Sequence, residues 1–274
     1  MTKKPPQQFP PKAYKDEAFI NSPEARPVRI LAEYIEPQTR FADHGIQDTI
    51  LFYGSARIIS REEAEEALEA CKAEGGDVAA AERRLEISKY YEATRELSHR
   101  LTQWSKDLRD ESGRRFVICT GGGPGIMEAA NRGASEAQGE NVGLGISLPF
   151  EVGNNPWVTR SLSMEFHYFF TRKFWFLYLA KALVLMPGGF GTMDELFEAL
   201  TLLQTRKMRK RLPIVLFGRE FWDKVLNFEA MVEFGTISPE DVELMVKTDS
   251  VDEAFKYITD QLCEHALDCP GGRL

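Results

Sequence analysis

The chain has 274 residues, of which 43% are hydrophobic, so it can bury a sizeable core in one large α/β domain or two small ones. Its net charge of −8 provides no general basic field, so we expect no nucleic-acid partner, and any phosphate ligand has to be held by local groups. The four cysteines form no Cys-x-x-Cys pair and have no histidines at metal spacing, which argues against a zinc site or a disulfide framework and favours a reduced, cytoplasmic setting.

The first part of the chain, residues 1–27, is rich in proline among polar residues. Such a composition cannot bury enough surface to order itself, so we predict a mobile N-terminal arm that ends in a helix over 27–35, followed by one domain over 28–268. Lys3 and Lys4 precede prolines and glutamines and no apolar segment, so we expect no signal peptide. The most apolar stretch, 166–186, contains three cationic side chains and is too interrupted to span a membrane.

A first strand, turn and helix are predicted near residue 50. The strand covers 49–53, and Gly54-Ser55-Ala56-Arg57 follows it as a turn. A helix then starts at Ser60, because Ser60-Arg-Glu-Glu63 matches the capping box. An amphipathic pattern over 79–109 predicts one long helix that crosses the sheet or reaches another subunit.

A second unit has the same organisation. Phe116 to Cys119 is the strand, Gly121 to Gly125 is a second glycine turn, and Pro124 suits the first position of the next helix. A third strand covers 142–147. The irregular loop over 148–163 has a length that suits a substrate cover.

A third unit of strand, glycine turn and helix is predicted around the stretch from Leu183 to Glu195. A nearly apolar pattern predicts a buried helix over 166–180, then a buried strand over 182–186, and a third glycine turn with Gly188, Gly189 and Gly191. Glycines let the backbone approach a ligand, and the start of the next helix attracts phosphate. The alternative is purely structural, because Thr192-Met-Asp-Glu195 also fits a capping box.

Strand and helix patterns continue to alternate to the end of the chain, with strands over 213–217 and 244–247 and helices over 221–232 and 251–264. Strands separated by helices throughout predict an α/β fold, a doubly wound parallel sheet of the Rossmann-like kind, in a single domain.

All three glycine turns follow strands, so they lie at the carboxyl edge of the predicted sheet, where such folds bind ligands. None of them matches Gly-x-Gly-x-x-Gly or the P-loop motif, so the turns indicate binding of a dinucleotide or a nucleoside triphosphate only weakly. Arg172 and Lys173 need anionic partners because an unpaired buried charge is costly. Arg172 could therefore meet a ligand or only hold a helix through a salt bridge. A Glu195 carboxylate paired with Arg172 should stay ionised at neutral pH and could stabilise positive charge at an anomeric carbon, which suggests N-glycosidic hydrolysis.

Three segments carry a family resemblance. Gly121-Gly-Gly-Pro-Gly-Ile-Met-Glu-Ala-Ala-Asn131, Arg172-Lys173 and Pro187-Gly-Gly-Phe-Gly-Thr-Met-Asp-Glu195 resemble the LOG (Lonely Guy) family of cytokinin riboside 5′-monophosphate phosphoribohydrolases, long mislabelled as lysine decarboxylases. The resemblance covers about 49–234 and is closest to the longer bacterial branch.

The resemblance implies cleavage of nucleoside 5′-monophosphates, AMP or cytokinin riboside monophosphates, to free base and ribose 5-phosphate without metal or organic cofactor. It places the catalytic residues at Arg172 and Glu195. With the turns above, the candidate binding residues are Gly54, Ser55, Gly122, Gly123, Glu151, Lys173, Gly188, Gly189, Phe190, Gly191, Thr192, Met193, Asp194 and Thr201.

The sequence departs from the family pattern in two ways, and two other functions are considered beside it. Phe169 stands where shorter plant-type members usually have Met, so we expect a different base pocket, and the longer branch implies a homo-oligomer, dimer or hexamer. Molybdenum-cofactor carrier proteins look similar in the Pro-Gly-Gly-x-Gly-Thr loop, so a non-catalytic nucleotide or cofactor carrier is the alternative function. Lysine decarboxylation would need pyridoxal phosphate on a lysine, for which the sequence shows no recognisable site.

Overall fold

A computed structural model describes residues 9–108, 113–147 and 153–272. Within these residues, seven strands form one parallel sheet, in the order β4-β3-β2-β1-β5-β6-β7. The strands are β1 (Thr49–Tyr53), β2 (Val117–Thr120), β3 (Asn141–Ile146), β4 (Ser163–Phe166), β5 (Ala180–Leu185), β6 (Ile214–Phe217) and β7 (Met245–Thr248). The predicted doubly wound parallel sheet is therefore confirmed.

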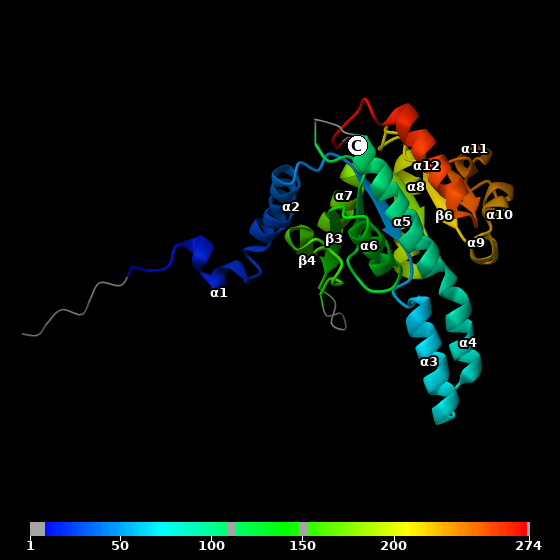
Figure 1. The fold of residues 1–274 in the computed structure, drawn as a ribbon. Helices are drawn as coiled ribbons and strands as arrows, with labels where there is room; N and C mark the ends of the chain where they lie inside the picture. The colour runs from blue at the N-terminus through cyan, green and yellow to red at the C-terminus, as the bar shows by residue number, and fades with distance from the viewer. Residues whose placement is uncertain (1–8, 109–112, 148–152, 273–274) are drawn as a thin grey trace, which may run out of the picture.

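Helices cover both faces of this sheet (Figure 1). The α-helices are α1 (Glu17–Ile20), α2 (Arg26–Asp43), α3 (Arg61–Glu74), α4 (Val78–Ile87), α5 (Lys89–Asp107), α6 (Ile126–Glu136), α7 (Phe169–Leu179), α8 (Phe190–Gln204), α9 (Arg219–Val225), α10 (Phe228–Glu233), α11 (Pro239–Val242) and α12 (Val251–His265). Two 3-10 turns cover Ala13–Lys15 and Arg160–Leu162. No helix in the described part of the chain is both long and apolar enough to cross a membrane.

The core lies in two layers because successive strand residues point to opposite faces. In β1, Leu51 and Tyr53 join the layer under α2, α7, α8, α9 and α10, whereas Ile50 and Phe52 join the layer under α5, α6 and α12. The strands are buried on both faces, which explains their continuous apolar runs.

The strand order reverses between β1 and β5, which are neighbours although β2, β3 and β4 lie between them in sequence. In doubly wound sheets, ligands bind beyond the carboxyl ends of the strands at this point. Tyr53 pairs with Leu185 at these ends. The turns that follow them, at Gly54 and Pro187, therefore flank the position at which a ligand is expected.

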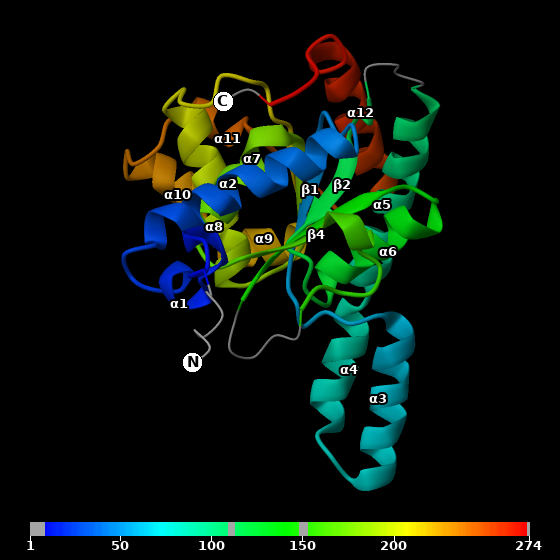
Figure 2. The same ribbon diagram turned by 90° about the vertical axis from the view of Figure 1, so that its left-hand side faces the viewer.

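Several predicted elements have different bounds. The helix expected over 27–35 runs to Asp43 and includes Pro37, which is buried together with Phe41. The long helix expected over 79–109 is two helices, since Ser88 interrupts it and its hydroxyl donates to the Leu85 carbonyl. Figure 2 shows α3 and α4 as a hairpin that projects from the body.

Other differences lie in the second half of the chain. The strand β4, a short edge strand that precedes α7, was not predicted from the sequence. The helix predicted over 221–232 is divided into α9 and α10, and α7 begins with the exposed Phe169 and Phe170, so only its later turns are buried as predicted. The capping box at Ser60 is confirmed.

Candidate functional site

The three glycine turns meet at the carboxyl edge of the sheet. The Ser55 N–H donates to the Pro187 carbonyl at 3.0 Å, and the Ser55 carbonyl accepts from the Ile126 N–H at 3.1 Å. Ser55 thus connects the first turn to the third turn and to the start of α6, directly after the second. The predicted proximity of the three turns is confirmed.

Packing inside the protein explains the glycines of the first two turns. A methyl group at Gly54 would come within 2.5 Å of the Ile126 side chain, and one at Gly121 within 2.6 Å of the Arg172 guanidinium. Gly122 has a φ of +75°, and a methyl group there would overlap the Asn154 amide. Gly54 and Gly122 are therefore needed by the fold whether or not a ligand binds, whereas the atoms nearest Gly121 are the ends of flexible side chains.

Asparagines hold the second turn from the loop that follows β3. The Asn155 amide donates to the Gly122 and Gly123 carbonyls, both at 3.0 Å, and to the Asn131 side chain at 2.9 Å. This loop was predicted to cover the substrate, but its described part, from residue 153, packs on the glycine turn. Pro124 precedes the helix and does not begin it, because Gly125 is the N-cap of α6.

The third turn differs from the first two because its backbone is open. Gly189 and Gly191 are exposed, and a methyl group on either would meet no atom within 4 Å. Helix α8 begins at Phe190, with Gly189 as an N-cap that provides no side-chain hydrogen bond. The Phe190 side chain is 96% exposed. The first N–H groups of α8 are therefore available to an anion in this open loop.

The capping box predicted for Thr192 and Glu195 is wrong, because α8 starts two residues before Thr192. The Thr192 hydroxyl lies instead against Gly188, where a methyl group would overlap it. Glu195 falls in the second turn of the helix and is free of a capping role.

Glu195 is the buried carboxylate of the site. Its side chain is 7% exposed, and its Oε2 atom has no hydrogen-bond partner among the described residues. Burial raises its pKa to about 7, although the positive charges of Lys173 and Arg172 lower that pKa. Glu195 is therefore only partly ionised at neutral pH, against the expectation that pairing with Arg172 keeps it ionised, because burial outweighs both cations.

Tyr53 belongs to the same site and was not among the residues predicted from the sequence. Its hydroxyl is buried and has no hydrogen-bond partner among the described residues. Burial raises its pKa well above the usual value, and the negative charge of Glu195 raises it further. The only signal in the sequence is its position as the last residue of β1, directly before Gly54.

Arg172 and Lys173 reach the site from α7 in different ways. Arg172 donates from Nε to the Leu144 carbonyl at 2.7 Å, and its guanidinium lies over the Phe176 ring beside Gly121. Lys173 has the anionic partners expected for it, since its Nζ atom lies 2.9 Å from the Asp194 carboxylate and 2.8 Å from that of Glu198. Lys173 therefore ties α7 to α8, whereas Arg172 lies over the second turn.

The remaining predicted residues are not all at the site. Met193 packs against the core, and Asp194 forms an ion pair with Lys173. Thr201 is exposed and lines a separate cavity with Gln204. Glu151 lies outside the described residues. No group of His, Cys, Asp and Glu residues suited to a metal ion is present in the described part of the chain.

Comparison with known proteins identifies relatives of part of the chain. The model of a family described as "Possible lysine decarboxylase" matches residues 127–258. A stretch of 86 residues is 34% identical to the cytokinin riboside 5′-monophosphate phosphoribohydrolase LOG1 of Arabidopsis thaliana, and this match spans 31% of the chain but only 39% of that relative.

Solved structures give broader but weaker matches. The protein TM1055 is 20% identical, with a TM-score of 0.48, over 78% of this chain and 99% of that one. A molybdenum-cofactor (Moco) carrier protein from Chlamydomonas reinhardtii is 17% identical, with a TM-score of 0.44, over 80% of this chain and 99% of that one. The family model over residues 127–258 and the sequence match to a LOG protein both agree with the resemblance found in the motifs.

Proposed function

We propose that the protein hydrolyses the N-glycosidic bond of nucleoside 5′-monophosphates, such as AMP or cytokinin riboside monophosphates, to free base and ribose 5-phosphate. The observation that carries the proposal is the buried Glu195 carboxylate, whose Oε2 atom has no partner in the described structure and which lies one helical turn from the open Gly189–Gly191 loop. The relationship to the phosphoribohydrolase of Arabidopsis supports it. An unsatisfied buried carboxylate is costly to keep, so a function at this position is the better explanation.

The phosphate would bind at the start of α8. The N–H groups of Phe190, Gly191 and Thr192 are the first of the helix and have no partner within it, and Gly189 offers no side-chain cap. The positive end of the helix dipole adds to the attraction for a phosphate. The 5′-phosphate at this loop would hold the ribose toward Glu195.

Glu195 would act on the ribose. As the bond between C1′ and the base nitrogen breaks, its electron pair leaves with the base and positive charge develops on the sugar. The ionised Glu195 carboxylate would stabilise that charge and accept a proton from the water whose oxygen bonds to C1′, while the departing base nitrogen takes up a proton. A pKa of about 7 suits proton transfer at neutral pH. Arg172 would position the substrate beside the second turn.

The test is turnover of a panel of nucleoside monophosphates, including AMP and a cytokinin riboside monophosphate, scored by chromatography for base and ribose 5-phosphate. We expect Glu195→Gln to bind AMP and to lose base release by about 100-fold or more. Glu198→Gln is the matched control, because Glu198 lies on the same helix and contacts Lys173. It should keep most of the activity.

Two results would contradict the proposal. Unchanged turnover in Glu195→Gln would remove Glu195 from the mechanism. Tight binding of monophosphates by the unmodified protein without release of any base would indicate a carrier instead of an enzyme.

A further inference from the structure

A second concentration of charge lies far from the glycine turns. The segment between α8 and β6 carries five cationic residues in six positions, Arg206-Lys-Met-Arg-Lys-Arg211, in a chain whose net charge is −8. Because this segment leads into β6, it lies at the amino edge of the sheet, opposite the edge formed by the glycine turns.

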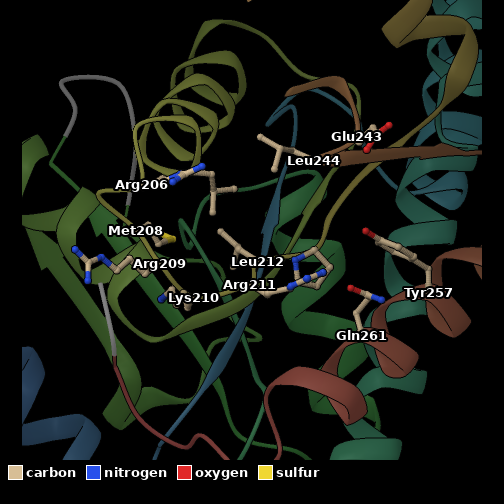
Figure 3. Close-up of a pocket in the computed structure, with 12 residues that line it drawn as sticks. Arg206, Met208, Arg209, Lys210, Arg211, Leu212, Glu243, Leu244, Tyr257 and Gln261 are labelled. Carbon is tan, nitrogen blue, oxygen red and sulfur yellow. The ribbon is translucent and has the colours of Figure 1, made fainter. Parts of the chain in front are cut away.

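The segment forms one wall of a cavity of about 640 Å³. Helix α12 contributes Tyr257 and Gln261, and Leu244, directly before β7, also lines the cavity. Figure 3 shows Arg211 extending toward Tyr257 and Gln261. The cavity has the size of a small-molecule site and combines apolar, aromatic, amide and cationic groups.

Among the residues that the structure describes, the arginines of this cavity have no carboxylate partner. Arg206, Arg209 and Arg211 form no ion pair within the residues that the structure describes, whereas exposed lysines elsewhere, such as Lys224 and Lys256, pair with a carboxylate one helical turn away. Glu243 is the acidic residue among those that line the cavity. The cavity therefore has an excess of positive charge.

Lys210 has a different role from these arginines. Its ammonium donates to the Leu177 and Tyr178 carbonyls at the end of α7, at 2.5 and 2.9 Å. Burial lowers its pKa to about 7. Lys210 thus caps a helix, and this structural role does not extend to Arg209 or Arg211, whose side chains are exposed.

We propose that this cavity binds a small organic molecule with two or more phosphate groups, of the nucleoside diphosphate or triphosphate class. Guanidinium groups bind phosphate oxygens through paired hydrogen bonds, and a cavity lined by three arginines suits a chain of phosphates better than a single one. Tyr257 offers a ring for stacking, and the Gln261 amide can donate to and accept from a base edge. The concave, partly apolar wall favours such a ligand over a nucleic acid or an anionic membrane, which would require an extended basic surface.

This site is independent of the proposed hydrolase site, because the two lie at opposite edges of the sheet. A monophosphate at the glycine turns and a polyphosphate at the basic cavity can therefore bind at the same time. The second ligand is then a candidate regulator and not a substrate.

Calorimetric titration at physiological salt with ADP, ATP and inorganic pyrophosphate tests the proposal. The double variant Arg209→Ala/Arg211→Ala should bind ADP and ATP about tenfold or more weakly, because each lost arginine removes charged hydrogen bonds. The matched control, Arg83→Ala/Arg84→Ala, removes the same charge from exposed positions on α4 and should bind both nucleotides normally.

Three results would overturn the proposal. The first is equal loss of binding in both double variants, which would indicate general attraction by net charge. The second is competition between ADP and AMP for one site, which would place ADP at the glycine turns. The third is binding of duplex DNA or anionic vesicles, but of none of the three small probes.

Discussion

Two buried groups of charges lie at opposite ends of the central strand β1. Asp48, directly before the strand, contacts Arg115 and Lys181. Tyr53, the last residue of the strand, lies in the same charged site as Glu195 and Arg172. Both groups contain one buried carboxylate near two cations, since Lys173 also acts on Glu195.

The group around Asp48 satisfies its polar atoms within the protein. Asp48 accepts from Arg115 and from the Gly271 N–H, at 3.2 Å for the latter, and lies 3.4 Å from the Lys181 ammonium. Arg115 also donates to the Leu267 and Ala266 carbonyls at 2.9 and 2.6 Å. These contacts fix the segment after α12 to the amino edge of the sheet.

The group around Glu195 leaves polar atoms unsatisfied. The Glu195 Oε2 and the Tyr53 hydroxyl are both buried, and neither has a partner among the described residues. The same combination of one buried carboxylate and two nearby cations therefore has two different roles. Charges that complete their hydrogen bonds internally stabilise the fold, and charges that do not complete them are available to a ligand at a cost in stability.

The largest effect is expected at Asp48. Asp48→Asn removes the negative charge that compensates buried Arg115 and Lys181, and should destabilise the protein by about 3 to 5 kcal/mol. Urea unfolding measures this change. The control Asp223→Asn removes the partner of Lys247 in a more exposed ion pair and should cost less than about 1 kcal/mol. Equal losses in the two variants would remove the distinction between the Asp48 group and a surface pair.

A change of the opposite sign is expected at Glu195. Because the folded state raises the pKa of Glu195, it binds this proton more tightly than the unfolded chain does. Ionising the buried carboxylate therefore lowers the free energy of unfolding. This loss is absent below pH 4.5, grows as the pH rises to about 7, and then stays constant at about 3 kcal/mol. The glutamine of Glu195→Gln is uncharged at every pH. The free energy of unfolding of this variant should therefore exceed that of the unmodified protein by an amount that grows from pH 4.5 to about 7.

Urea unfolding of both proteins from below pH 4.5 to above pH 7 measures the difference. A stability difference that does not change with pH would show that burial does not raise the pKa of Glu195. The contrast with Asp48, whose pKa is itself raised by burial, would then rest only on the hydrogen bonds that Asp48 accepts and the Glu195 Oε2 atom lacks.

Local patterns predicted most of the sheet and the position of the site. The apolar runs that form β1, β2, β5 and β6 end at glycine or proline turns, so the existence of these strands followed from the sequence, whereas their order in the sheet did not. The strand β4 did not, because its four residues alternate in burial at the edge of the sheet and merge with the aromatic run of α7. The start of α8 was misplaced because Thr192-Met-Asp-Glu195 imitates a capping box.

The properties that distinguish the two charge groups depend on contacts between distant segments. Arg115 is 67 residues from Asp48, and no pattern in the sequence pairs them. The raised pKa of Glu195 results from burial by other elements, which the presence of nearby cations did not reveal. Tyr53 appeared only as part of an apolar strand, because the chain that surrounds its hydroxyl is remote in sequence.

The smallest effect on stability is expected at Tyr53, and it tests whether the unsatisfied hydroxyl serves a ligand. Tyr53→Phe removes a buried hydroxyl that has no partner and should raise the stability of the free protein by up to about 1 kcal/mol, as measured by urea unfolding. In the control Tyr91→Phe, the lost hydroxyl donates to Glu128 at 3.2 Å, so stability should fall by a similar amount.

The same two variants separate a ligand contact from a packing defect. If the Tyr53 hydroxyl bonds to a bound monophosphate or helps to orient Glu195, Tyr53→Phe should bind AMP or release its base less well although it is more stable, whereas Tyr91→Phe should do both normally. A Tyr53→Phe variant that is more stable and unchanged in binding and turnover would show that the hydroxyl is only an imperfection of the core. Function at the carboxyl end of β1 would then depend on Glu195 without Tyr53. The contrast with the Asp48 group, whose polar atoms are satisfied, would rest on the Glu195 carboxylate alone.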